Sequence, residues 1–280
     1  MPREEKKTLP SISPPQNEPT MATTPDQKVI FFDLMGTCSD WLTSILEALS
    51  HAPPHPSLTP PDQALRSLAL TWRADFFTEI HARNAANAPF EDIDTTHRRI
   101  LDRLLAARGI GLDAWDESVR NTLVAKWHSQ KAWQDVIPAL ETLRARGDWF
   151  FVVLANGTMR LQLDIAQASG IPFHALLSSE LLGAAKPDLK AYEKAMELVG
   201  VKRENCYMLA SHLYDLEAAK KAGMRTIYVH RLTEDVGVEK VNLEGEHNYV
   251  DLYFDGRQMK GCLARGFWGV AAELIQESLE

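Results

Sequence analysis

Four polar side chains of this sequence follow apolar segments of the chain, and their types are suited to covalent hydrolysis. In chain order they are Asp33, Asn156, Lys186 and Asp215. A carboxylate can attack an electrophile and form an ester, and a lysine beside that carboxylate lowers its pKa and keeps it ionised. A second carboxylate can orient or deprotonate the water that cleaves the ester. Backbone N–H groups near Gly36 and Gly157, with the Asn156 amide, could bind developing negative charge.

The elements that must position these side chains alternate between strand and helix. Short apolar runs predict buried strands at 29–32, 149–155, 175–178, 206–210, 225–229 and 250–254. Apolar residues at helical spacing predict helices at 41–49, 136–145, 161–168, 188–199, 213–221 and 267–279. Alternating strands and helices indicate right-handed crossovers and a parallel sheet. Ligands bind beyond the carboxyl ends of such strands, where the four polar residues lie.

A helical insertion is expected within this α/β pattern. Residues 51–61 contain five prolines and predict an irregular connection, and residues 62–133 show only helical spacing of apolar side chains. The expected fold is a Rossmann-like parallel sheet core with an inserted helical cap domain. We assign 28–50 and 134–280 to the core and 51–133 to the cap. Residues 1–27 are rich in Pro, Ser, Thr and charge, which predicts a disordered tail.

The sequence carries four motifs in an order that resembles the haloacid dehalogenase superfamily. They are FFDLMGTCSDW, LANGT, AAKPDLKAY and YMLASHLYDLEAAKKAG. Within the superfamily, the chain is most similar to the L-2-haloacid dehalogenases. Most phosphatases of the superfamily carry a second aspartate two residues after the nucleophile, whereas this chain has Met35 there. LANGT also resembles the dehalogenase form of the second motif.

The resemblance implies a role for each matching residue. Asp33 becomes the nucleophile, with Lys186 and Asp215 as catalytic partners. TWRADFF lies where those dehalogenases keep the arginine that receives the departing halide, which implies that role for Arg73. The implied substrate-binding residues are Met35, Thr37, Asn156, Gly157, Tyr192, Ser211 and Tyr214.

Three positions depart from the dehalogenase pattern. Ala155 replaces a serine that binds the substrate carboxylate, Ala210 replaces the first serine of the fourth motif, and His212 replaces an asparagine that helps place water. Two lost hydroxyls remove hydrogen bonds to charged groups worth roughly 1.5–3 kcal/mol each, so we do not expect a short 2-haloacid as substrate. His212 is either a general base, a hydrogen-bond partner of Asp215, or a loop histidine that fills space.

Three functions are compatible with these residues. The first is a cofactor-independent hydrolase that acts on a carbon electrophile through an Asp33 ester. In the second, the same fold serves a biosynthetic elimination, cyclisation or C–O hydrolysis of a larger substrate. The third, which we rank last, is a magnesium-dependent phosphatase using Asp33, the Met35 carbonyl and Asp215. Ala210 and Ser211 stand where a phosphatase usually supplies another carboxylate, so neither a metal nor another cofactor is expected.

The composition bounds the partners and the compartment. A net charge of −8 over 280 residues disfavours nucleic acid. No apolar run reaches the roughly 20 residues of a membrane span. Three cysteines without short spacing suggest neither a disulfide framework nor a zinc site, which favours a reduced, cytoplasmic location. We expect a small-molecule substrate, and the resemblance suggests a homodimer formed through the cap helices.

Overall fold

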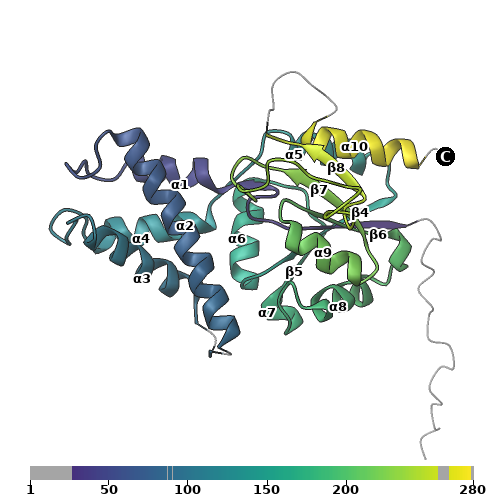
Figure 1. The fold of residues 1–280 in the computed structure, drawn as a ribbon, viewed down its shortest axis with the longest axis horizontal. Coiled ribbons are helices and arrows are strands. Elements are labelled where there is room, and N and C mark those ends of the chain that lie inside the picture. Colours follow the sequence, from purple (N-terminus) through teal and green to yellow (C-terminus); the bar gives the residue numbers. More distant parts are fainter. Residues whose placement is uncertain (1–26, 87, 90, 258–264, 279–280) are drawn as a thin grey trace, which may run out of the picture.

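The centre of the molecule is a six-stranded sheet in which all strands are parallel. A computed structural model describes residues 27–86, 88–89, 91–257 and 265–278 (Figure 1). The sheet order is β5-β4-β1-β6-β7-β8. Its strands are β1 (Lys28–Phe32), β4 (Trp149–Ala155), β5 (Ala175–Ser178), β6 (Cys206–Ala210), β7 (Arg225–His230) and β8 (Leu252–Asp255). The predicted Rossmann-like α/β class is therefore confirmed.

Helices cover both faces of the sheet, because side chains of successive strand residues point to opposite faces. On one face Ile30 and Phe32 pack with α5 (Val136–Arg144), α6 (Met159–Ser169) and α10 (Gly266–Glu277). On the other face Val29 and Phe31 pack with α8 (Leu189–Val199) and α9 (Leu213–Lys221). Four short elements complete this part of the chain: α7 (Ser179–Leu182), η2 (Arg203–Asn205), and the antiparallel pair β2 (Ser39–Asp40) and β3 (Lys131–Ala132). The sheet is buried on both sides, as continuous apolar strands require.

A second group of helices lies beside the sheet (Figure 1). It contains α1 (Trp41–Ser50), α2 (Pro61–Ala85), α3 (Ile93–Ala106), α4 (Glu117–Ala125) and the short η1 (Lys126–His128). These helices share their own apolar cluster, built around the fully buried rings of Trp41, Trp72, Trp115 and Trp127. Although we assigned α1 to the core by sequence, its buried side chains belong to this cluster. The boundaries between core and cap stay a prediction.

Most predicted elements match the structure, but the short elements β2 and η2 were not predicted, and three further differences follow. Residues 131–132 form the short strand β3, so the segment 62–133 is not helical throughout. The last strand occupies Leu252–Asp255 instead of 250–254, because its pairing with β7 begins at Leu252. The short helix α7 was not predicted. The expected disordered tail lies, apart from Gln27, outside the described residues. Among the described helices, none is both long and apolar enough to cross a membrane.

Candidate active site

Asp33 lies directly after β1, at the carboxyl edge of the sheet and next to the point where the strand order reverses. Parallel sheets open a crevice at such a point. Lys186 Nζ lies 2.9 Å from Asp33 Oδ1, and the Thr37 hydroxyl donates to Asp33 Oδ2 at 2.8 Å. The Ser211 backbone N–H donates to the same Thr37 oxygen at 2.8 Å, which orients the hydroxyl proton toward Asp33. Both carboxylate oxygens of Asp33 therefore have fixed donors.

Asp215 lies on the far side of the same lysine. Lys186 Nζ donates to Asp215 Oδ2, and the Tyr192 hydroxyl donates to Asp215 Oδ1 at 2.5 Å. Asp215 is 0% exposed and Lys186 is 4% exposed. One ammonium thus bridges two buried carboxylates, and each oxygen of Asp215 already accepts a hydrogen bond.

The charges of this cluster settle the ionisation of Asp33. Burial alone would raise the pKa of Asp33, but Lys186 and His212 together hold it well below its usual range. Burial would likewise lower the pKa of Lys186, but Asp215 and Asp33 raise it above its ordinary value. Burial raises the pKa of Asp215. Asp33 is therefore ionised at neutral pH and has the charge that a carboxylate nucleophile requires.

His212 faces Asp33 instead of Asp215, so its predicted hydrogen bond to Asp215 is wrong. Its Nδ1 lies 3.3 Å from Asp33 Oδ2, within ion-pair distance but without hydrogen-bond geometry. Its Nε2 lies 2.8 Å from Glu234 Oε2. Trp41 Nε1 donates to the other oxygen of Glu234 at 2.7 Å. His212 therefore lies between Asp33 and Glu234, and the Trp41 indole holds the Glu234 carboxylate in place.

Arg73 brings a buried positive charge to the same place. It is 8% exposed and donates from Nη1 to the Met35 sulfur at 2.8 Å. The rings of Trp41, Phe77 and Trp127 surround its guanidinium carbon at 5.4, 4.1 and 5.8 Å. Its Nε has no hydrogen-bond partner, and among the described residues no carboxylate lies within ion-pair distance of it. A buried guanidinium with an unused donor is suited to receive an anion.

Several residues predicted to bind substrate or developing charge are occupied by the protein itself. The Asn156 side-chain oxygen accepts a hydrogen bond from the Lys186 backbone N–H at 2.8 Å, and its Nδ2 donates to the Lys186 carbonyl at 2.9 Å. These two hydrogen bonds position the lysine. The Gly157 N–H donates to Ser179, and the Gly36 N–H donates to the Ser39 carbonyl. The N–H groups of Gly36 and Gly157 are therefore already bonded within the protein, and one of the two N–H groups of the Asn156 amide holds Lys186.

The remaining serine and tyrosine of the fourth motif differ in placement. The Ser211 hydroxyl donates to the Val229 carbonyl at 2.5 Å and is fully buried, so only its backbone N–H serves the cluster. Tyr214 is 39% exposed, and its ring centre lies 5.6 Å from that of His212. Tyr214 therefore lines the outer side of the histidine.

The carboxylate oxygens at this site are not arranged to coordinate a magnesium ion. Mg²⁺ needs free carboxylate oxygens in near-octahedral geometry. Both oxygens of Asp33 and both oxygens of Asp215 are taken by Lys186, Thr37 and Tyr192. Within the described part of the chain, no group of three or more His, Cys, Asp or Glu side chains is arranged to bind a metal. Metal independence itself stays a prediction.

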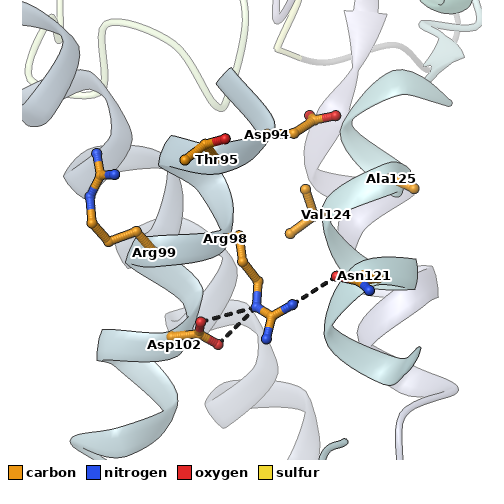
Figure 2. A pocket seen from close by; sticks show the side chains of 8 residues that line it. All are labelled: Asp94, Thr95, Arg98, Arg99, Asp102, Asn121, Val124 and Ala125. Carbon is orange, nitrogen blue, oxygen red and sulfur yellow. Dashed lines mark hydrogen bonds and ion pairs between the residues drawn. The ribbon is translucent and has the colours of Figure 1, made fainter. Parts of the chain in front are cut away.

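A surface groove between α3 and α4 lies away from Asp33 (Figure 2). Its cations are already neutralised. Arg98 Nε lies 3.0 Å from Asp102, and Arg98 Nη1 donates to Asn121 at 2.7 Å. Arg99 pairs with Glu79 and Glu91 outside the groove. We assign this groove no ligand.

Glu234 is the site residue that the sequence reasoning missed. It lies four residues beyond β7, a strand that the sequence predicts, so the rule that ligands gather at strand ends would have included it if the segment after that strand had been taken as part of the site. A second indication is Gly36, at φ +88°, where a Cβ would lie 2.3 Å from Glu234 Cδ. The carboxyl group of Glu234 thus occupies space that only a glycine leaves open.

Comparison with known proteins places the chain among related hydrolases. A family model described as haloacid dehalogenase-like hydrolase matches residues 27–223. A phosphatase from Mycobacterium tuberculosis is 33% identical over 124 residues, which cover 44% of this chain and 56% of the phosphatase. The chain thus spans little more than half the length of that relative.

Dehalogenases match over a larger share of the chain. An (S)-2-haloacid dehalogenase from Pseudomonas sp. (strain YL) is 25% identical over 206 residues, covering 73% of this chain and 83% of that protein. The crystal structure of an L-2-haloacid dehalogenase superimposes with a TM-score of 0.72 at 25% identity, covering 89% of this chain and 99% of the other. The predicted resemblance is therefore confirmed.

Proposed function

Because the chain belongs to the haloacid dehalogenase-like hydrolase family, we propose that it hydrolyses a carbon electrophile through an ester formed on Asp33. The observation that carries this proposal is the environment of Asp33. Asp33 is 8% exposed, its Oδ1 lies 2.9 Å from Lys186 Nζ, and its Oδ2 accepts a hydrogen bond from the Thr37 hydroxyl. Arg73 on α2 is a buried cation, and no carboxylate of the described residues lies within ion-pair distance of it.

The proposed first step is a displacement at carbon. One oxygen of Asp33 forms a bond to the substrate carbon, and the bond from that carbon to the leaving group breaks. The leaving group takes the electron pair and departs as an anion beside Arg73, whose charge acts over a longer range in this buried setting than in water. Lys186 keeps Asp33 ionised before the attack. Water then cleaves the ester at the Asp33 carbonyl carbon and releases an alcohol.

The proposed substrate is larger than a short 2-haloacid. Ala155 and Ala210 lack the hydroxyls that the resemblance assigns to dehalogenases, so the carboxylate of a short 2-haloacid would lose hydrogen bonds here. A repurposed enzyme for elimination, cyclisation or C–O hydrolysis of a larger molecule is the alternative within the same fold. A homodimer and a cytoplasmic location stay predictions.

A single turnover in ¹⁸O-labelled water tests the ester. With enzyme in excess over L-2-bromopropionate, even a slow reaction completes one cycle. We expect unlabelled lactate, because its new oxygen comes from Asp33, and we expect one ¹⁸O atom in the peptide that contains Asp33. Mass spectrometry of both products measures this. Labelled lactate in the first turnover, with an unlabelled peptide, would show direct attack by water and exclude the ester.

A phosphatase function is the second candidate, favoured by the match to the M. tuberculosis phosphatase. Because the oxygens of Asp33 and Asp215 are already bonded to protein donors, we expect little hydrolysis of p-nitrophenyl phosphate with or without Mg²⁺. Dehalogenation of L-2-bromopropionate should be unchanged by excess chelator. Phosphate release that is fast, abolished by chelator and restored by Mg²⁺ would favour the phosphatase over the ester mechanism on carbon.

A further inference from the structure

We propose that His212, held in place by Glu234, is the base that accepts a proton from water when the Asp33 ester is hydrolysed. This inference rests on the proposed ester. His212 Nδ1 lies 3.3 Å from Asp33 Oδ2, and Nε2 lies 2.8 Å from Glu234 Oε2. The arrangement of nucleophile, imidazole and orienting carboxylate is the one that proton transfer at a nucleophile requires.

The other candidate base is poorly placed to act. Each oxygen of Asp215 already accepts a hydrogen bond, one from Lys186 and the other from Tyr192, and these bonds hold the carboxylate against the lysine. Asp215 is also fully buried behind the lysine. Its structural task is to hold Lys186 against Asp33. His212 Nδ1, by contrast, makes no hydrogen bond and points at the carboxylate that would carry the ester.

Glu234 fixes which nitrogen of His212 faces the reaction. Because a carboxylate only accepts, the Nε2 atom carries a proton, and the lone pair of the neutral ring is then on Nδ1. Glu234 is itself immobilised by Trp41 Nε1 at 2.7 Å and by close contact with the Gly36 backbone. The imidazole is therefore preorganised with its basic atom toward Asp33.

Charge explains why this base becomes available only after the ester has formed. The charged and titratable groups that surround His212 come from four elements: Asp33 after β1, Glu234 after β7, Tyr214 on α9, and Arg73 on α2, which acts mainly on the two carboxylates. Burial lowers the pKa of His212, but the two carboxylates raise it well above its usual value. Esterification removes the charge of Asp33, so that pKa must fall.

The proton balance then closes over one cycle. When Asp33 is esterified, His212 gives its extra proton to solvent, or to the departing group if that group is a basic oxygen. Water attacks the ester carbonyl carbon, and the bond from that carbon to the product oxygen breaks. Of the two water protons, one ends on the product hydroxyl and the other on His212. Asp33 returns as a carboxylate, and His212 is again protonated beside it.

The charge switch can be measured without a substrate. Asn at position 33 resembles the ester in being neutral, so we compare imidazole ¹⁵N shifts of wild type and Asp33→Asn across pH. His212 should be protonated at neutral pH in wild type, and its pKa should fall by about 1–3 in Asp33→Asn. Glu234→Gln should also lower it, which identifies the resonance. A His212 pKa that is the same in wild type and Asp33→Asn would overturn the switch.

Ester trapping tests the role as a base. His212→Gln and His212→Ala, mixed with L-2-bromopropionate and quenched, should accumulate the Asp33 ester in intact-protein mass spectra, whereas wild type should not. Ester breakdown should slow by about 10²–10⁴-fold, the usual contribution of general base catalysis. Glu234→Gln should slow it less and shift the pH profile, and Glu234→Asp should restore part of the rate.

The outcomes separate this inference from the proposed function. If the ester breaks down equally fast in wild type and in both His212 variants, His212 is not the base, but the proposed ester mechanism still holds. If no variant and no wild-type sample forms an ester, the proposed function fails, and the inference fails with it. If the ester accumulates in the His212 variants and not in wild type, the result supports both the proposed ester and the role of His212 as the base. Circular dichroism of every variant confirms that the readout comes from folded protein.

Discussion

Asp33→Asn is expected to lower kcat by about 10⁴-fold or more, the scale seen when a nucleophile is removed. The amide keeps the shape of the carboxylate but cannot attack carbon. It also leaves Lys186 with Asp215 as a partner, so the variant should stay folded. Release of bromide from L-2-bromopropionate in a single turnover, with enzyme in excess over this short substrate, measures the loss. Thermal unfolding and intact mass confirm a folded, correctly substituted protein.

Two further variants make this prediction specific. Asp33→Ala should be as inactive as Asp33→Asn, because both lack the attacking oxygen. Thr37→Val is the matched control. It removes the hydroxyl that donates to Asp33 at 2.8 Å but keeps the nucleophile. Activity should therefore fall far less, by about 10–100-fold, which corresponds to the loss of one charge-assisted hydrogen bond. If Asp33→Asn retains a tenth of wild-type activity, Asp33 is not the nucleophile.

The fold was predictable because its signals are local and agree with one another. The four apolar residues after Lys28 predict a strand, and each of them is 0% exposed at the centre of the sheet. The sharp change to charged or polar residues at Asp33 and Asn156 marks the carboxyl ends of two strands. Once all strands are parallel, these ends must share one edge, which brings distant residues together. The short pair β2 and β3 is different, because two residues carry no periodic signal.

The clustering of three site residues was predictable, but Glu234 and the pairings within the site were not. The types of Asp33, Lys186 and Asp215 suggested one cluster, and the structure places Lys186 between the two carboxylates. The partner of His212 depends on which way its ring turns, and Glu234 lies 22 positions away in a loop without a motif. Likewise, the Asn156 amide is used to hold Lys186, because buried backbone groups must find partners. The type of a residue shows which chemistry its side chain could perform, but its contacts decide whether its polar atoms are available for a substrate.

Adding hydroxyls at Ala155 and Ala210 is expected to raise kcat/KM for L-2-chloropropionate by about 10²–10⁴-fold. Each restored hydrogen bond to a charged group contributes roughly 1.5–3 kcal/mol, or about 10–100-fold. The structure adds that the two alanines lie on opposite faces of the sheet. Ala155 packs with the α5, α6 and α10 side, and Ala210 packs with the α8 and α9 side. Their hydroxyls cannot hold the same atom, so their effects should be additive.

The experiment compares Ala155→Ser, Ala210→Ser and the double variant by chloride release. Ala139→Ser is the matched control, because it adds a buried hydroxyl in α5 and should not raise chloride release. Arg73→Ala in the double variant should remove the gain, because the departing chloride then lacks its cation. Wild-type protein that already dechlorinates the L-enantiomer at about 10⁴ M⁻¹s⁻¹ or faster would contradict the prediction. The two alanines would then be tolerated replacements within a working dehalogenase, and the larger substrate would have no support.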